Sequence, residues 1–162
     1  MAAQKILVVF YSRSGTTRRI AEALAAELKC DAEEIIEAES RTGFLGIMRS
    51  LIEAARQRPG RIVPARHNPS SYDLVVIGTP VWAWSVASPI RAYLMENGKH
   101  LPQVAFFCTL GHRGSESTFA QMQDLAGKVP RAKAAFKTRD VAAGSFPPRL
   151  AEFVRALGSS SS

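Results

Sequence analysis

The sequence has no long hydrophobic run. Its N-terminal apolar stretch, Ile6–Tyr11, is six residues, which is too short for the core of a signal peptide, and no small-residue cleavage site follows it. No other apolar stretch approaches the length that a membrane-spanning helix needs. We therefore expect a cytoplasmic protein without a transmembrane segment.

Cysteine is also scarce. The two cysteines, Cys30 and Cys108, lie far apart in the sequence. Without a secretion signal, this number does not indicate a structural disulfide. Two widely spaced cysteines do not supply a zinc site either, so we expect no bound metal.

Acidic residues are fewer than basic ones. The chain has 21 Lys and Arg against 14 Asp and Glu, which gives a net charge of +7 and a pI near 9.9. A basic surface is compatible with an acidic protein partner, an anionic membrane surface or nucleic acid, but it also occurs for solubility alone.

Three motifs of related α/β folds are missing. The first turn does not match the Gly-x-Gly-x-x-Gly pattern of dinucleotide sites. A receiver domain needs acidic residues at strand ends, whereas Asp73 precedes its strand. Cys108 and Arg113 are spaced one residue short of the Cys-x5-Arg phosphatase loop, which would also have to follow the first strand.

Apolar strands alternate with amphipathic helices along the chain. This order predicts a doubly wound α/β fold with helices on both faces of a parallel sheet. Five strands on a single domain suit the order 2-1-3-4-5, so we expect a three-layer sandwich over residues 1–158 and a flexible tail over 159–162. The expected strands are Lys5–Tyr11, Asp31–Ile36, Leu74–Ile77, Gln103–Cys108 and Ala132–Thr138. The expected helices are Thr16–Lys29, Phe44–Arg58, Val86–Asn97, Glu116–Leu125 and Pro148–Leu157.

Three loops would meet at one edge of this sheet. They follow the first, third and fourth strands and comprise Ser12–Thr17, Thr79–Ser85 and Thr109–Ser115. Ligands of doubly wound sheets bind at that edge, beside the first strand. Ser12–Thr17 leads from a strand into a helix, whose free N–H groups attract anions. Its hydroxyls add donors, although serines at this position also serve as ordinary helix caps.

The motifs in these loops resemble those of the flavodoxin family. Ser12-Arg13-Ser14-Gly15-Thr16-Thr17 is similar to the family's phosphate loop. Tyr72 to Trp82 resembles the third strand with the first flavin-flanking loop, and Phe106 to Gly111 loosely resembles the fourth strand with the second. The resemblance covers nearly the whole chain and implies noncovalent binding of FMN with a redox function.

The same resemblance implies which residues bind FMN. The phosphate would be held by Ser12, Ser14, Gly15, Thr16 and Thr17, with Arg13 in the same loop. One side of the flavin ring would be lined by Pro80, Val81, Trp82 and Ala83, and the other by Thr109, Leu110, Gly111 and Gly114. We expect Trp82 to stack on the ring, with Trp84 as the alternative. No catalytic side chain is expected, because the cofactor carries the chemistry.

Three functions follow as hypotheses. The first is electron transfer by an FMN protein, and the second is an FMN-dependent NAD(P)H:quinone-type oxidoreductase acting on a small aromatic acceptor. The third is a flavin-free module that binds a partner. Family members that act as mobile carriers are typically acidic, so this basic chain suggests an acidic redox partner or an anionic surface. We expect no nucleic acid and leave the oligomeric state open.

The expected helix Phe44–Arg58 has a wide apolar stripe flanked by arginines. Such a helix usually packs on its own sheet. The alternatives are a dimer contact, or a surface for an acidic partner or anionic lipid.

Overall fold

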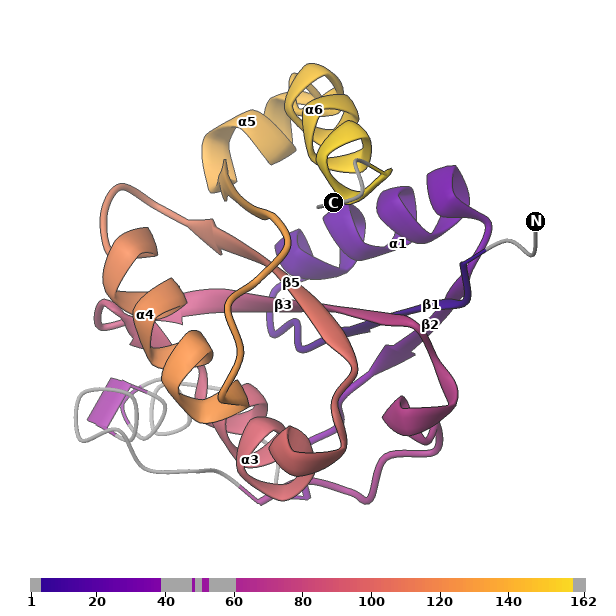
Figure 1. Cartoon of the computed structure of the whole chain (residues 1–162). Coiled ribbons are helices and arrows are strands. Elements are labelled where there is room, and N and C mark those ends of the chain that lie inside the picture. Colours follow the sequence, from indigo (N-terminus) through magenta and orange to yellow (C-terminus); the bar gives the residue numbers. More distant parts are fainter. Residues whose placement is uncertain (1–3, 39–47, 49–50, 53–60, 159–162) are drawn as a thin grey trace.

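Five parallel strands form the centre of the molecule. The computed structural model describes residues 4–38, 48, 51–52 and 61–158. Its sheet has the strand order β2-β1-β3-β5-β6 (Figure 1). The strands are β1 (Ile6–Phe10), β2 (Asp31–Glu34), β3 (Leu74–Trp82), β5 (Gln103–Leu110) and β6 (Lys133–Lys137). Among the parallel strands, this is the predicted order 2-1-3-4-5.

The predicted count of five strands is wrong. A sixth, β4 (Ser85–Val86), pairs antiparallel with the end of β3. The strand β3 continues beyond its apolar run and Ile77, through Gly78-Thr79-Pro80, as far as Trp82, where the chain folds back. The segment that we predicted as a loop is therefore a hairpin. Because Val86 belongs to this hairpin, the following helix begins at Ser88 rather than at the predicted Val86.

Helices cover both faces of the sheet, as the fold class requires. On one face lie α1 (Thr16–Leu28), α5 (Thr138–Ala143) and α6 (Pro147–Gly158), and on the other lie α3 (Ser88–Asn97) and α4 (Ser115–Ala126) (Figure 1). The connections contain two short 3-10 helices, Pro69–Ser71 and Gly98–His100.

Alternating side chains of the central strands fill two cores. In β1, Leu7 and Val9 belong to the core under α3 and α4, whereas Val8 and Phe10 belong to the core under α1 and α6. Burial on both faces explains why the strand reads as a continuous apolar run. The sheet therefore fixes the positions from which its carboxyl-edge loops leave.

Most of the predicted helix Phe44–Arg58 lies outside the described residues. Met48, Leu51 and Ile52 are described, are helical, and are 41%, 43% and 45% exposed. The predicted tail 159–162 also lies outside. Among the helices that the structure does describe, none is long and apolar enough to cross a membrane.

Candidate functional site

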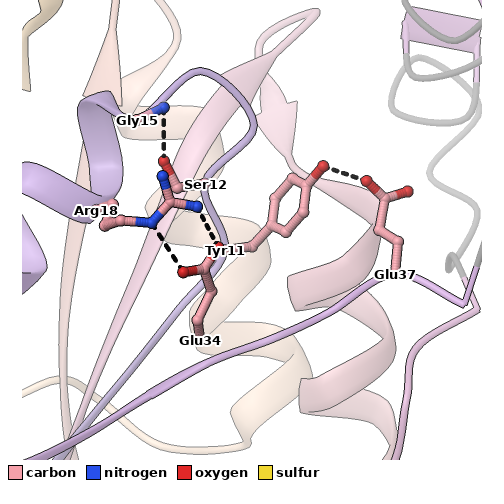
Figure 2. Close-up of polar contacts among 6 residues, drawn as sticks. All are labelled: Tyr11, Ser12, Gly15, Arg18, Glu34 and Glu37. Carbon is pink, nitrogen blue, oxygen red and sulfur yellow. Dashed lines mark hydrogen bonds and ion pairs between the residues drawn. The ribbon is translucent and has the colours of Figure 1, made fainter. Parts of the chain in front are cut away.

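The β1–α1 loop begins helix α1 without a capping side chain. The Oγ of Ser12 accepts a hydrogen bond from the N–H of Gly15 at 3.1 Å, which folds the loop on itself (Figure 2). Gly15 has a φ of 99°, a conformation that glycine adopts without strain. Within the described chain, no side chain caps α1 and no acidic residue lies in its first turn. The first-turn N–H groups therefore keep the hydrogen-bonding capacity and positive potential that attract an anion.

An ion pair lies beside this helix start. The guanidinium of Arg18 donates two hydrogen bonds to the carboxylate of Glu34, at 2.9 and 2.5 Å, from the end of β2 (Figure 2). The hydrogen bond to Glu34 raises the pKa of Arg18, and the charge of Glu34 adds to this rise. Glu34 thus neutralises a cation in the first turn of α1. The sequence did not point to this pair, since it joins a helix to a different strand.

The β1–α1 loop is tied to the end of β5 by a buried contact. The hydroxyls of Thr17 and Thr109 are 2.7 Å apart, and both residues are buried. Each hydroxyl can donate or accept, so the pair satisfies itself inside the protein. Two of the three predicted loops are therefore fixed to one another.

The third loop is the β3–β4 hairpin. Its strands pair Val81 with Val86 and Trp82 with Ser85, which leaves a two-residue turn. Both turn residues have positive φ, 49° at Ala83 and 60° at Trp84. This geometry matches the twist of a hairpin, although asparagine and glycine are the usual residues there.

The two tryptophans of the hairpin have opposite environments. Trp82 is 7% exposed and packs edge-on against the ring of Tyr11, with the ring centroids 5.5 Å apart. The guanidinium carbon of Arg13 lies 5.7 Å from the centroid of the Trp82 ring. Trp84, in contrast, is 65% exposed at the turn. Stacking of Trp82 on a flavin stays a prediction, and Trp84 offers the more accessible ring.

Tyr11 links the site to the segment after β2. Its hydroxyl donates a hydrogen bond to the carboxylate of Glu37 (Figure 2). Glu37 in turn bridges to Ile62 in an isolated antiparallel pair. Tyr11 and Glu37 were missed from the sequence, because only the fold brings a tyrosine at the end of β1 beside that carboxylate.

The β5–α4 loop packs closely on the hairpin. Gly114 has a φ of 108°, and a Cβ placed there would lie 2.8 Å from Cδ1 of Trp84 and 2.9 Å from Cγ1 of Val81. The hydroxyl of Ser117 donates to the carbonyl of Trp84 at 2.6 Å. The three loops are thus joined pairwise, as the fold prediction required.

Cys108 does not have the environment of a nucleophile. It is fully buried in β5, and burial raises the pKa of its thiol to about 12. A thiol with this pKa stays protonated at neutral pH. The structure therefore agrees with the rejection of a phosphatase loop.

A sequence profile of the flavodoxin family matches residues 5–137. The chain belongs to the flavodoxin family. The match spans β1 through β6 and so includes all three loops of the site. A search among curated proteins found no match.

Solved structures share the flavodoxin fold. A Lactobacillus acidophilus flavoprotein, solved in complex with FMN, is 24% identical; the alignment covers 87% of this chain and 98% of that one, with a TM-score of 0.71. A Bacteroides eggerthii protein is 23% identical, with coverages of 88% and 96% and a TM-score of 0.71. The two-electron reduced flavodoxin of Megasphaera elsdenii is 15% identical, with coverages of 81% and 85% and a TM-score of 0.53. At these identities the likeness is one of fold.

The residues that the resemblance to flavodoxins predicts to bind FMN all lie at the carboxyl edge of the sheet, in or next to the loops that follow β1, β3 and β5. Buried members form the base of the site: Ser12, Thr17, Trp82, Thr109 and Leu110. Partly or fully exposed members form its rim: Arg13, Ser14, Gly15, Thr16, Pro80, Val81, Ala83, Gly111 and Gly114. Their individual roles toward the cofactor remain predictions.

Proposed function

We propose that this flavodoxin-family protein binds FMN and transfers electrons. The observation that carries the proposal is the junction of three loops at the carboxyl edge of the sheet, next to an uncapped helix start. The contacts Thr17–Thr109, Arg13–Trp82 and Ser117–Trp84 join them. The family binds FMN, and one protein of the same fold was solved with FMN bound.

The first turn of α1 is suited to the phosphate of FMN. Helix α1 begins with Thr16 and Thr17, whose N–H groups lie in its first turn. The hydroxyls of Ser14 and Thr16 lie 3.4 Å apart at the surface. Such groups hold a phosphate by hydrogen bonds and the helix dipole, without a dedicated counter-ion. The pairing of Arg18 with Glu34 is consistent with this arrangement.

The hairpin and the β5–α4 loop would flank the ring system. When bound, FMN supplies the electron-transfer chemistry. The protein's residues bind the ring, orient it and exclude water from its buried side, where Trp82 and Leu110 are 7% and 5% exposed.

Absorption spectroscopy of the purified protein, before and after addition of FMN, tests the proposal. We expect a flavin spectrum and tight binding of FMN. Riboflavin lacks the phosphate and therefore its contacts with the start of α1, so it should bind at least about tenfold more weakly. A tenfold loss of affinity corresponds to about 1.4 kcal/mol. A protein that is still colourless after incubation with excess FMN and removal of the unbound flavin would instead be a flavin-free interaction module.

The partner that we propose is an acidic redox protein. Three cationic or titratable side chains at this edge, Arg13, His112 and Arg113, are exposed. Together with the net charge of +7, they favour a negatively charged partner through long-range attraction. The rate of electron transfer to an acidic carrier should then fall as ionic strength rises, whereas transfer to a basic carrier should not.

The second candidate is an FMN-dependent NAD(P)H:quinone-type oxidoreductase. A substrate that stacks on the flavin needs a face that no fixed ring occupies. Trp82 is held against Tyr11 and would lie only on the buried side of the flavin, which leaves the opposite side to a small acceptor. Steady-state oxidation of NAD(P)H with a quinone acceptor separates the two functions. Turnover without a carrier protein supports the enzyme, and its absence supports the electron carrier.

A further inference from the structure

The turn of the β3–β4 hairpin has an unusual backbone for its sequence. Ala83 and Trp84 both lie in the left-handed region, with φ values of 49° and 60°. Residues with a Cβ are strained there, so hairpins with this turn usually carry Asn-Gly. Neither residue relieves that strain by itself, so contacts from outside the turn must stabilise it.

Helix α4 supplies those contacts from two residues one helical turn apart. Ser117 donates its hydroxyl to the carbonyl of Trp84 at 2.6 Å. The side-chain amide of Gln121 accepts from the N–H of Val86 at 3.1 Å and donates to the hydroxyl of Ser85 at 3.2 Å. Residues at this spacing share one face of a helix, so α4 presents both to the hairpin.

Helix α3 fixes the orientation of the glutamine. Arg91 is 5% exposed, and its guanidinium donates to Oε1 of Gln121 at 2.7 Å. The same oxygen accepts from Val86, so two donors converge on it. An amide held in this way must direct its NH2 group to the remaining acceptor, the hydroxyl of Ser85.

We propose that Ser117 and Gln121, supported by Arg91, form a hairpin clamp that sets the β3–β4 turn before any cofactor binds. The clamp takes over the role that glycine or asparagine plays in other hairpins. The consequence for binding rests on the proposed function: if the hairpin lines the flavin ring, its clamped form is the binding-competent form. Loss of the clamp then weakens FMN binding in proportion to the population of that form.

Hydrogen exchange on the FMN-free protein tests the clamp without reference to the cofactor. In Ser117→Ala, we expect the amides of the hairpin to exchange about fivefold faster, the effect of one lost hydrogen bond on a local opening equilibrium. Gln121→Ala should act on the same amides, whereas Gln121→Glu keeps an acceptor for Val86 and Arg91 and should restore protection. The matched control is Gln123→Ala, an exposed position on the same helix. Hairpin exchange at the wild-type rate in Ser117→Ala and Gln121→Ala would overturn the clamp.

FMN titration then tests the positioning role. Ser117→Ala should raise the Kd for FMN by up to about fivefold, because the Kd rises as the clamped fraction falls and one hydrogen bond shifts that equilibrium about fivefold. Ser117→Thr keeps a hydroxyl and should bind like the wild type. Faster hairpin exchange with unchanged FMN affinity would refute positioning. A wild-type protein that binds no FMN would refute the proposed function, while the exchange data would still decide the clamp.

Discussion

Gly114 gives the sharpest test of how the two flanking loops fit together. Its φ of 108° is a conformation that L-residues rarely adopt, and a Cβ would meet Trp84 at 2.8 and 2.9 Å and Val81 at 2.9 Å. Two of those neighbours are Cα of Trp84 and a methyl of a partly buried valine, so neither can simply swing away. In Gly114→Ala, the added methyl must therefore displace either the hairpin or the loop.

The expected loss has two parts. Holding an alanine at left-handed φ costs about 1–2 kcal/mol. Forcing a methyl into a packed contact costs about 1–3 kcal/mol. Because the structure around the new methyl relaxes in part, the strain cost and the packing cost do not add fully. We therefore expect Gly114→Ala to lower the free energy of unfolding by about 2–4 kcal/mol. Urea denaturation of the FMN-free protein measures this value directly.

Gly111 is the matched control in the same loop. A Cβ there would have no atom of the described residues within 4 Å, and its φ is not positive. Gly111→Ala should therefore change the free energy of unfolding by no more than about 0.5 kcal/mol. If both variants unfold at the same urea concentration as the wild type, the close packing of the hairpin on the β5–α4 loop does not exist.

Two substitutions and one labelling experiment test separate parts of the structure. Arg13→Ala should weaken FMN binding more at low than at high salt if Arg13 reaches the phosphate, and equal Kd values in a salt series would place it outside the site. Glu33 is buried and accepts hydrogen bonds from two backbone N–H groups and the His67 ring at 2.6–2.8 Å, so Glu33→Gln should cost about 1–3 kcal/mol in urea unfolding. Cys108, whose pKa is raised to about 12, should stay unreacted with a thiol reagent at pH 8 while the protein is folded; rapid labelling would contradict its burial.

The strand order and the junction of the three loops could be predicted from the sequence. Apolar runs such as Leu7–Phe10 are buried on both faces, and this signal is local. The parallel topology then assigns the loops to one edge by geometry alone. The prediction of the site therefore rested on a few strong local patterns, and the fold brings the three loops together as expected.

The hairpin could not be predicted in the same way. Its turn, Ala83-Trp84, lacks the asparagine, aspartate or glycine that is typical of a two-residue hairpin, so the sequence pattern indicated an irregular loop. What stabilises it comes from Ser117 and Gln121, far along the chain. The pairs Arg18–Glu34 and Tyr11–Glu37 were hidden for the same reason. Long-range polar contacts leave no periodic signal in a sequence.

The location of backbone strain itself supports the position of the site. Among described residues other than glycine, positive φ occurs at Lys29, Ala83 and Trp84. Lys29 ends α1, a place where left-handed residues are common. Ala83 and Trp84 are consecutive and lie on the edge where the three loops meet, and the described contacts of α4 hold them there. A strained turn persists only where its surroundings determine it, and such turns concentrate at ligand sites.

Replacing Ala83 by asparagine, which tolerates left-handed φ, should therefore stabilise the protein by up to about 1 kcal/mol in urea unfolding. A destabilised Ala83→Asn variant would show that the turn is not strained in solution.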